Sequence, residues 1–316
     1  MEVEVSTRET YGKTLIELGK RNPSIVVLDA DLSPSTMTRF FAKEFPQRFF
    51  DCGLEEQNMI GIAAGLAASG KTVFASTFAI FASCRCFDQL RICLSQMGLN
   101  VKIVATHGGI TVGEDGTSHQ AIEDLALYCA LPGFTVIVPA DAVETAQAIK
   151  VAADSYGPFY IRLNRPKTPL VYEENYRFKL GKAVTMRLGT DVTIIATGIM
   201  VAKALQASDT LARQEIDCRV INMPTLKPLD EEFLVKAASE TRAIVVAEEH
   251  LAHGGLGSRV AQVVARHQPV PMEFVNLKDR YALSGKADEL LERYGLTAKD
   301  IEQAVRAVTS RAKGSP

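Results

Sequence analysis

Short apolar runs alternate with longer helical patterns along the whole chain. In the first half, the runs at 25–28, 72–74, 101–104 and 135–138 are nearly continuous in apolar residues. Such runs are typical of strands that are covered on both faces. A capping box of Ser6 and Glu9 opens the first expected helix, and further helices are expected at about 56–69 and 80–97. The alternation predicts parallel sheets with helices on both faces.

The alternation breaks near 166–176, where two prolines and a polar run interrupt it, and then restarts. Strands are expected at 192–196, 218–221, 243–247 and 272–275, with helices at about 199–213, 230–239 and 255–267. We therefore predict the α/β fold class, with two parallel-sheet domains. The first covers 1–167, a linker covers 168–180, and a smaller domain covers 181–316.

Size and composition agree with a two-domain globular enzyme. The chain has 316 residues, of which 47% are hydrophobic and 23% charged, which is ordinary for such proteins. Thirty-five basic and 37 acidic residues give a net charge of −2, unlike the basic surface of a nucleic-acid binder. The N-terminus lacks the features of a signal peptide, and no apolar stretch is long enough to span a bilayer. We expect a cytoplasmic protein with no nucleic-acid or membrane partner.

The glycine-rich loop 106–120 follows the expected strand 101–104 and carries most of the candidate chemistry. It contains four glycines, an acidic pair, and His107 and His119. In open α/β sheets, ligands bind beyond the carboxyl ends of strands, and glycines allow close approach of the backbone. A surface turn that only satisfies its own backbone is the alternative. Two of the chain's five histidines fall within these fifteen residues, which favours a ligand site. The spacing of these two histidines is unfavourable for a metal site, and the chain has no CxxC pair.

Two other stretches are informative only in combination with this loop. Glu56 begins a helix after the expected short strand 48–52, where an acid could simply complement the helix dipole. Phe78 and Phe81 lie three residues apart, a spacing that also suits core packing.

Together these stretches resemble the transketolase family, in particular its pyrimidine-binding domain. The segments 53–59 (GLEEQNM), 77–81 (TFAIF) and 106–120 match the family's glutamate motif, aromatic stretch and substrate loop. The resemblance implies thiamine diphosphate as cofactor and a two-carbon ketol transfer from a ketose phosphate to an aldose phosphate. It implies that Glu56 exchanges a proton with the cofactor's aminopyrimidine ring, that Phe81 stacks on this ring, and that Phe78 lies nearby.

The same resemblance implies the substrate contacts. His119, also catalytic, and Asp115 would face sugar hydroxyls, whereas His107, Arg39 and Arg165 would face the phosphate. Residues 61–64 are small or apolar, and we expect them to surround Glu56 and to favour its protonated form. The cofactor would perform the covalent step.

The family's GDG motif, which holds Mg²⁺ and the diphosphate, is absent from this chain. We therefore expect a split transketolase in which this chain is the C-terminal subunit, inactive without an N-terminal subunit that carries GDG. The assembly is expected to be a heterotetramer in which this chain also associates with itself. The metal would be held mainly by the partner, and no metal ligand is assigned to this chain.

Several alternatives stay open. Cys84, Arg85 and Cys86 differ from full-length transketolases, which could signal an unusual sugar phosphate. A deoxyxylulose-phosphate synthase-like enzyme is disfavoured by His107, and the beta subunit of 2-oxo acid dehydrogenases lacks the glycine-rich loop. A non-catalytic binding or regulatory subunit is disfavoured by the retained site residues. The segment 253–258 approximates a dinucleotide fingerprint but lacks its third glycine, so a tight strand–helix turn is expected there.

Overall fold

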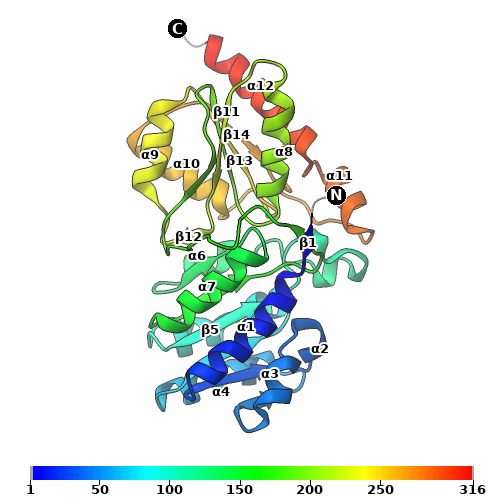
Figure 1. Cartoon of the computed structure of the whole chain (residues 1–316), viewed down its shortest axis with the longest axis vertical. Coiled ribbons are helices and arrows are strands. Elements are labelled where there is room, and N and C mark those ends of the chain that lie inside the picture. Colours follow the sequence, from blue (N-terminus) through cyan, green and yellow to red (C-terminus); the bar gives the residue numbers. More distant parts are fainter. Residues whose placement is uncertain (1–2, 315–316) are drawn as a thin grey trace.

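The computed structural model describes residues 3–314. Residues 1–2 and 315–316, which the two expected domains include, lie outside the described part. A seven-stranded sheet and a five-stranded sheet follow one another along the long axis of the molecule, each flanked by helices (Figure 1). Both sheets are predominantly parallel, so the predicted α/β class is confirmed.

The seven-stranded sheet has the order β12-β6-β7-β5-β4-β2-β3. Its neighbouring strands are parallel except for β12. Side chains alternate between its two faces, so that Ile25 and Val27 pack with α1 and α7, whereas Val26 and Leu28 pack with α4. The strands are β2 (Ile25–Asp29), β3 (Phe49–Asp51), β4 (Thr72–Ser76), β5 (Val101–Ala105), β6 (Thr135–Ile137), β7 (Phe159–Arg162) and β12 (Thr225–Lys227). The longer helices around it are α1 (Thr7–Arg21), α4 (Glu56–Ala68), α6 (Asp124–Ala130) and α7 (Ala142–Asp154).

The five-stranded sheet has the order β14-β13-β10-β11-β9, with only β9 antiparallel to its neighbour. Its strands are β9 (Val184–Arg187), β10 (Val192–Ala196), β11 (Cys218–Asn222), β13 (Ile244–Ala247) and β14 (Met272–Val275). Helices α8 and α12 pack on one face, and α9 and α10 on the other. The helices are α8 (Met200–Ala212), α9 (Glu231–Glu240), α10 (Leu256–His267), α11 (Ala287–Tyr294) and α12 (Ala298–Gly314).

Shorter elements complete the chain. The predicted capping box is present in part, since the Glu9 amide donates to Ser6 Oγ. The expected helix at 80–97 is broken into π-helical segments η2 (Phe81–Arg85) and η3 (Leu90–Ser95) around α5 (Phe87–Gln89). Such segments widen the helix by one residue and often lie at functional sites. The remaining short elements are β1 (Glu4–Val5), α2 (Ser33–Thr36), α3 (Arg39–Glu44), η1 (Pro46–Arg48), η4 (Ile110–Asp115), η5 (Thr117–His119) and β8 (Thr168–Pro169).

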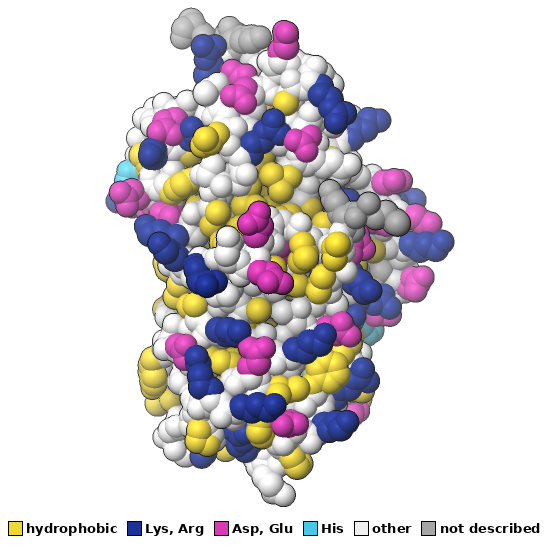
Figure 2. Space-filling view, viewed as in Figure 1, with side chains coloured by type: hydrophobic (Ala, Val, Ile, Leu, Met, Phe, Trp, Pro, Cys, Tyr) yellow, Lys and Arg dark blue, Asp and Glu magenta, His cyan; other side chains and the backbone are white. Residues whose placement is uncertain are grey.

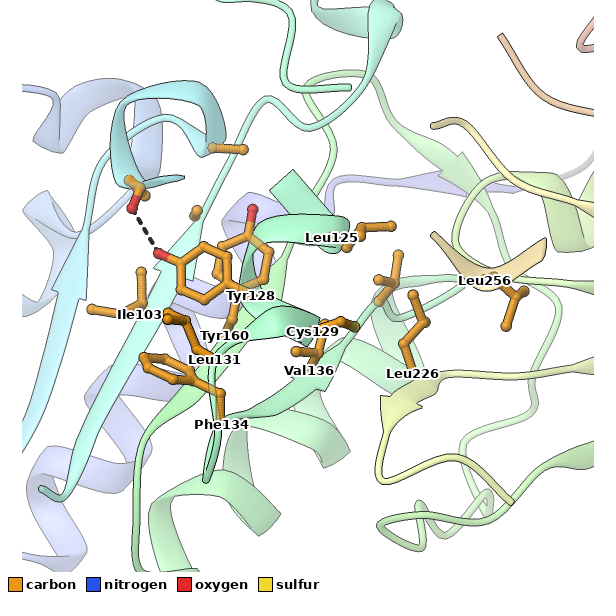
Figure 3. Close-up of a cluster of buried hydrophobic side chains, with 14 of the residues drawn as sticks. Ile103, Leu125, Tyr128, Cys129, Leu131, Phe134, Val136, Tyr160, Leu226 and Leu256 are labelled. Atoms are coloured by element: carbon orange, nitrogen blue, oxygen red, sulfur yellow. Dashed lines mark hydrogen bonds between the residues drawn. The ribbon is translucent and has the colours of Figure 1, made fainter. Parts of the chain in front are cut away.

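Strand β12 joins the two halves, because it belongs to the second half but pairs antiparallel with β6. The Lys227 ammonium donates to the Cys129 and Leu131 carbonyls. Figure 3 shows the resulting core, in which the Leu226 side chain lies beside those of Val136 and Cys129. One apolar cluster therefore continues from the first sheet to the second.

The connection that we predicted as a linker is bound to both halves. The amides of Val171 and Tyr172 donate to Asp141, and Tyr176 donates to Glu144. Asn222, at the end of β11 in the second half, donates to the Tyr172 hydroxyl and to both carboxylate oxygens of Glu144. The boundaries of the two domains stay a prediction, but the segment between them is well anchored.

Glu144 makes the stability of the fold depend on pH. Burial raises the pKa of this carboxyl from 4.5 to about 7. Between these values the folded chain binds a proton that the unfolded chain does not, so the free energy of unfolding falls as pH rises. We expect Glu144→Gln to remove this contribution, on the order of 3 kcal/mol, when urea unfolding is compared at pH 4.5 and pH 8. Parallel pH profiles for variant and wild type would contradict this assignment.

Acidic and basic side chains are interspersed on the face shown in Figure 2. Within residues 3–314, no helix combines the length and the apolar character that crossing a bilayer requires.

Candidate active site

The candidate residues converge at the carboxyl ends of β4 and β5. Phe78 follows β4 and forms a bridge with Thr106, which follows β5. The Ala79 amide donates to the Thr106 carbonyl, and the Thr106 amide donates to the Thr77 carbonyl. The aromatic stretch and the start of the glycine-rich loop therefore lie side by side, as expected for neighbouring strand ends.

Glu56 begins α4 and its side chain is fully buried. Thr77 donates to its Oε1 at 3.2 Å, and Arg85 Nη1 donates to its Oε2 at 2.6 Å. We expected residues 61–64 to give Glu56 apolar surroundings. This expectation is wrong for Gly61 and Ile62, which are exposed on the outer face of α4. Polar contacts surround the carboxylate instead.

Arg85 contacts two of the predicted cofactor residues at once. Besides its ion pair with Glu56, its guanidinium lies over the Phe81 ring, 4.3 Å from the centroid. Its position depends on η2, which also contains Phe81. A flat cation thus fills the space between a buried carboxylate and an aromatic face.

An aromatic and imidazole cluster continues from Phe81 toward the loop. Phe78 stacks on His107 at 3.8 Å between centroids, and the edge of His119 meets Phe81 at 5.3 Å. Phe78 and Phe81 are themselves stacked at 5.9 Å. Glu56 is therefore linked to both loop histidines through Arg85 and these rings.

His107 lies in a buried and positively charged environment. Burial, with Arg8 and Arg165 nearby, lowers the pKa of His107 to about 3, so its imidazole is neutral at physiological pH. Thr106 Oγ1 lies 2.8 Å from His107 Nδ1. The positive charge at this end of the site comes from the two arginines.

Arg165 and Arg8 connect the glycine-rich loop with the segments around Ser35 and Arg165 through hydrogen bonds. Arg165 donates to the Val112 carbonyl in the loop and lies 4.0 Å from the Asp115 carboxylate. Arg8 donates to the carbonyls of Ser35 and Arg165 at 2.7 and 3.0 Å. Arg8 could not be identified from the sequence, since an isolated arginine in the first turn of a helix belongs to no motif.

Arg39 is the predicted residue that the structure does not bring into this cluster by direct contact. Its side chain is exposed, and its guanidinium lies 5.6 Å from the centroid of Phe40. The segment before it is well fixed, because the buried Asp29 carboxylate accepts hydrogen bonds from Thr36 and Thr38. Within residues 3–314, no hydrogen bond, ion pair or ring contact joins Arg39 to the other candidate residues.

The dinucleotide-like segment 253–258 forms the expected tight turn. The buried Glu248 carboxylate accepts from the amides of Leu256 and Gly257, both at 2.7 Å. These amides begin α10 and would otherwise be available to an anion. The Glu248 side chain therefore occupies the amides of this helix terminus.

Among the described residues, no three His, Cys, Asp or Glu side chains are grouped so as to hold a metal.

Comparison with known families agrees with this arrangement. Residues 3–171 match the transketolase pyrimidine-binding domain, and residues 181–301 match the transketolase C-terminal domain. The chain belongs to the transketolase family. A protein named as a transketolase C-terminal section, from Methanocaldococcus jannaschii, is 48% identical over 94% of both chains.

Two further transketolase relatives are informative. The 6-deoxy-6-sulfo-D-fructose transketolase subunit SqwH of Clostridium sp. (strain MSTE9) is 43% identical over 96% of this chain and 94% of that protein. A solved structure described as a split gene transketolase, inactive beta4 tetramer, is 51% identical, covers 97% of this chain and 99% of its own, and has a TM-score of 0.91. Transketolase subunits of this kind are therefore similar to this chain over nearly their whole length.

The residues present fit the pyrimidine end of thiamine diphosphate, which transketolase-family domains imply as cofactor. The Arg85 guanidinium is a stand-in for the pyrimidine ring, because this flat, nitrogen-rich group contacts both the Glu56 carboxylate and the face of Phe81. An aminopyrimidine needs the same two partners, a carboxyl and an aromatic face. The sequence pointed out Arg85 only as a departure from the family and said nothing of this contact.

Proposed function

We propose that this chain is the C-terminal subunit of a split transketolase, a cytoplasmic enzyme that transfers a two-carbon ketol unit from a ketose phosphate to an aldose phosphate. The observation that supports it most is the convergence of Glu56, Phe81 and His119 beside the glycine-rich loop. The partner would be an N-terminal subunit with a GDG motif that anchors Mg²⁺ and the diphosphate. Two copies of each subunit would form the heterotetramer.

In this proposal, thiamine diphosphate supplies the nucleophilic carbon when it is bound. Glu56 holds and exchanges a proton at the pyrimidine nitrogen opposite the amino group, and Phe81 orients the ring, with Phe78 supporting it. A buried carboxyl that Thr77 already positions is suited to this task, since general acid–base catalysis depends on fixed geometry. Arg85 has to withdraw from Glu56 before the ring can enter.

The loop side of the site would bind the sugar. His119 and Asp115 would form hydrogen bonds with hydroxyl groups, and His119 would also assist proton transfer. Arg165 and Arg39 would bind the phosphate, because a guanidinium can donate to two oxygens at once. His107, whose lowered pKa keeps it neutral, would add a hydrogen bond without adding charge.

Reconstitution with the partner tests this function. Mixed with the N-terminal subunit, Mg²⁺ and thiamine diphosphate, the chain should convert xylulose 5-phosphate and ribose 5-phosphate into sedoheptulose 7-phosphate. Either subunit alone should give no product. Activity of this chain by itself would contradict the split site.

A second candidate is transfer from a different anionic sugar. The 43% identical relative is named for 6-deoxy-6-sulfo-D-fructose, whose sulfonate is a tetrahedral anion like a phosphate but carries one negative charge instead of nearly two. Cys84 and Arg85 are the last two residues of η2 and are exposed, and Arg85 contacts Glu56, so these two departures from full-length transketolases could alter sugar preference. Comparison of kcat/KM for xylulose 5-phosphate and 6-deoxy-6-sulfo-D-fructose, with the same acceptor, would separate the two candidates.

A further inference from the structure

The glycine-rich loop is held by the second half of the chain. Glu249 lies just after β13, and its side chain is only 3% exposed. Its Oε1 accepts a hydrogen bond of 2.7 Å from the Thr111 amide, in the middle of the loop. A buried carboxylate that accepts from a backbone amide forms a strong, charge-assisted bond.

Gly109 shows how closely the loop approaches this carboxylate. A Cβ atom placed on Gly109 would lie 2.1–2.4 Å from the carboxylate atoms of Glu249. Its φ of +78° is also one that residues other than glycine rarely adopt. A side chain at position 109 would therefore displace the Glu249 carboxylate as well as strain the turn.

The segment between β14 and α11 holds the other end of the loop. Thr117 Oγ1 donates to the Ala282 carbonyl at 2.7 Å, and Gln120 Nε2 donates to the Leu283 carbonyl at 2.9 Å. Ser284 Oγ donates to the Glu114 carbonyl at 2.7 Å. These bonds flank Asp115 and His119, the two residues proposed to face the sugar.

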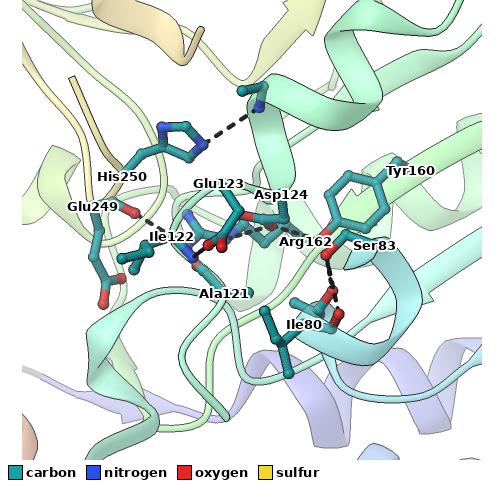
Figure 4. A network of polar contacts seen from close by, with 12 residues as sticks. Ile80, Ser83, Ala121, Ile122, Glu123, Asp124, Tyr160, Arg162, Glu249 and His250 are labelled. Carbon is teal, nitrogen blue, oxygen red and sulfur yellow. Dashed lines mark hydrogen bonds and ion pairs between the residues drawn. The ribbon is translucent and has the colours of Figure 1, made fainter. Parts of the chain in front are cut away.

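A buried arginine connects these contacts to the first sheet. Arg162, on β7, donates to the carbonyls of Ala121 and Glu249 and lies 3.1 Å from the Asp124 carboxylate (Figure 4). Burial raises the pKa of Glu249 to about 6, and Arg162 opposes that rise. The Glu249 carboxyl is therefore charged at pH 7.5, where it accepts most strongly.

We infer that Glu249 is a positioning residue, which together with Ser284 holds the glycine-rich loop in the geometry that sugar binding requires. This inference rests on the proposed function and gives the second domain a part in forming the substrate site. Glu249 touches neither cofactor nor sugar in this scheme. It acts through the Thr111 amide and the backbone of Gly109.

The test compares Glu249→Leu with Glu249→Gln in the reconstituted enzyme at pH 7.5. Leucine cannot accept the Thr111 bond, so KM for the ketose phosphate should rise about tenfold, the loss expected for one charge-assisted bond. Glutamine keeps an acceptor oxygen and should restore most of the affinity. The Kd for thiamine diphosphate should stay within about twofold of wild type, which a general loss of folding would not allow.

Two serine variants test the inference independently, in case Glu249→Leu does not fold correctly. Ser284→Ala should raise KM, whereas Ser258→Ala, which alters a hydrogen bond within the second domain at Ala252, should not. Equal KM values for Ser284→Ala, Ser258→Ala and wild type would overturn the inference. So would a Glu249→Leu enzyme with unchanged KM.

Amide hydrogen exchange separates this inference from the proposed function. Peptides covering 107–120 should exchange at least about tenfold faster in Glu249→Leu, while peptides from α8 and α12 stay protected. This readout needs no substrate. Faster loop exchange in Glu249→Leu, together with a reconstituted wild-type enzyme that lacks transketolase activity, would support the contact and reject the proposed function. Unchanged exchange in Glu249→Leu would reject the positioning role.

Discussion

Replacing Glu56 by glutamine should lower the kcat of the reconstituted enzyme at least about 100-fold, the lower range for one positioned acid–base group. Glutamine has nearly the same size and can still accept from Thr77, so the local packing should be preserved. It cannot exchange a proton at the pyrimidine nitrogen. Rates of two-carbon transfer at saturating thiamine diphosphate would show the loss as one of turnover.

Glu55→Gln provides the matched control, because Glu55 is the preceding residue and its side chain is exposed. Its kcat should stay close to that of wild type. A Glu56→Gln enzyme with nearly normal turnover would refute the proposed role of this carboxyl and, with it, the assignment of the pyrimidine site.

The second large effect concerns Arg85, whose removal should strengthen cofactor binding by about ten- to a hundredfold. The pyrimidine has to displace a 2.6 Å bond between Arg85 and Glu56, and bonds to charged groups contribute about 1.5–3 kcal/mol. In Arg85→Ala this bond no longer opposes binding. Calorimetry with thiamine diphosphate and Mg²⁺ on the assembled complex would measure the change.

The same substitution should lower the stability of the cofactor-free chain, because it leaves the buried Glu56 carboxylate without its partner. Arg91→Ala is a suitable control, since Arg91 is an exposed arginine six residues later on η3. Weaker cofactor binding in Arg85→Ala would show that Arg85 belongs to the loaded site instead of competing with the ring.

Much of the fold follows from local pattern. Nearly continuous apolar runs such as 192–196 and 244–247 are strands because both faces of a parallel sheet are covered, and that requirement is visible in the sequence. Strand β12 could not be predicted, because Thr-Leu-Lys has no pattern of its own and forms a strand only by pairing with β6. The irregular helix at 80–97 is similar, since a helical pattern does not reveal a single widened turn.

The site divides in the same way. The glycine-rich loop and the Glu56 and Phe81 motifs could be found because they are contiguous and their residue types match a known chemistry. Glu249 and Arg8 could not, because each acts on a segment more than 25 residues away through backbone groups. Contacts to the main chain leave no motif that would single out either partner.

Because β12 completes the sheet of the other half, the two halves are not interchangeable modules. A chimera that takes its second half from another subunit has to supply an equivalent edge for β6 and an equivalent of Lys227 for the Cys129 and Leu131 carbonyls. Recombination at the connecting segment alone would leave the edge of β6 open to unwanted pairing.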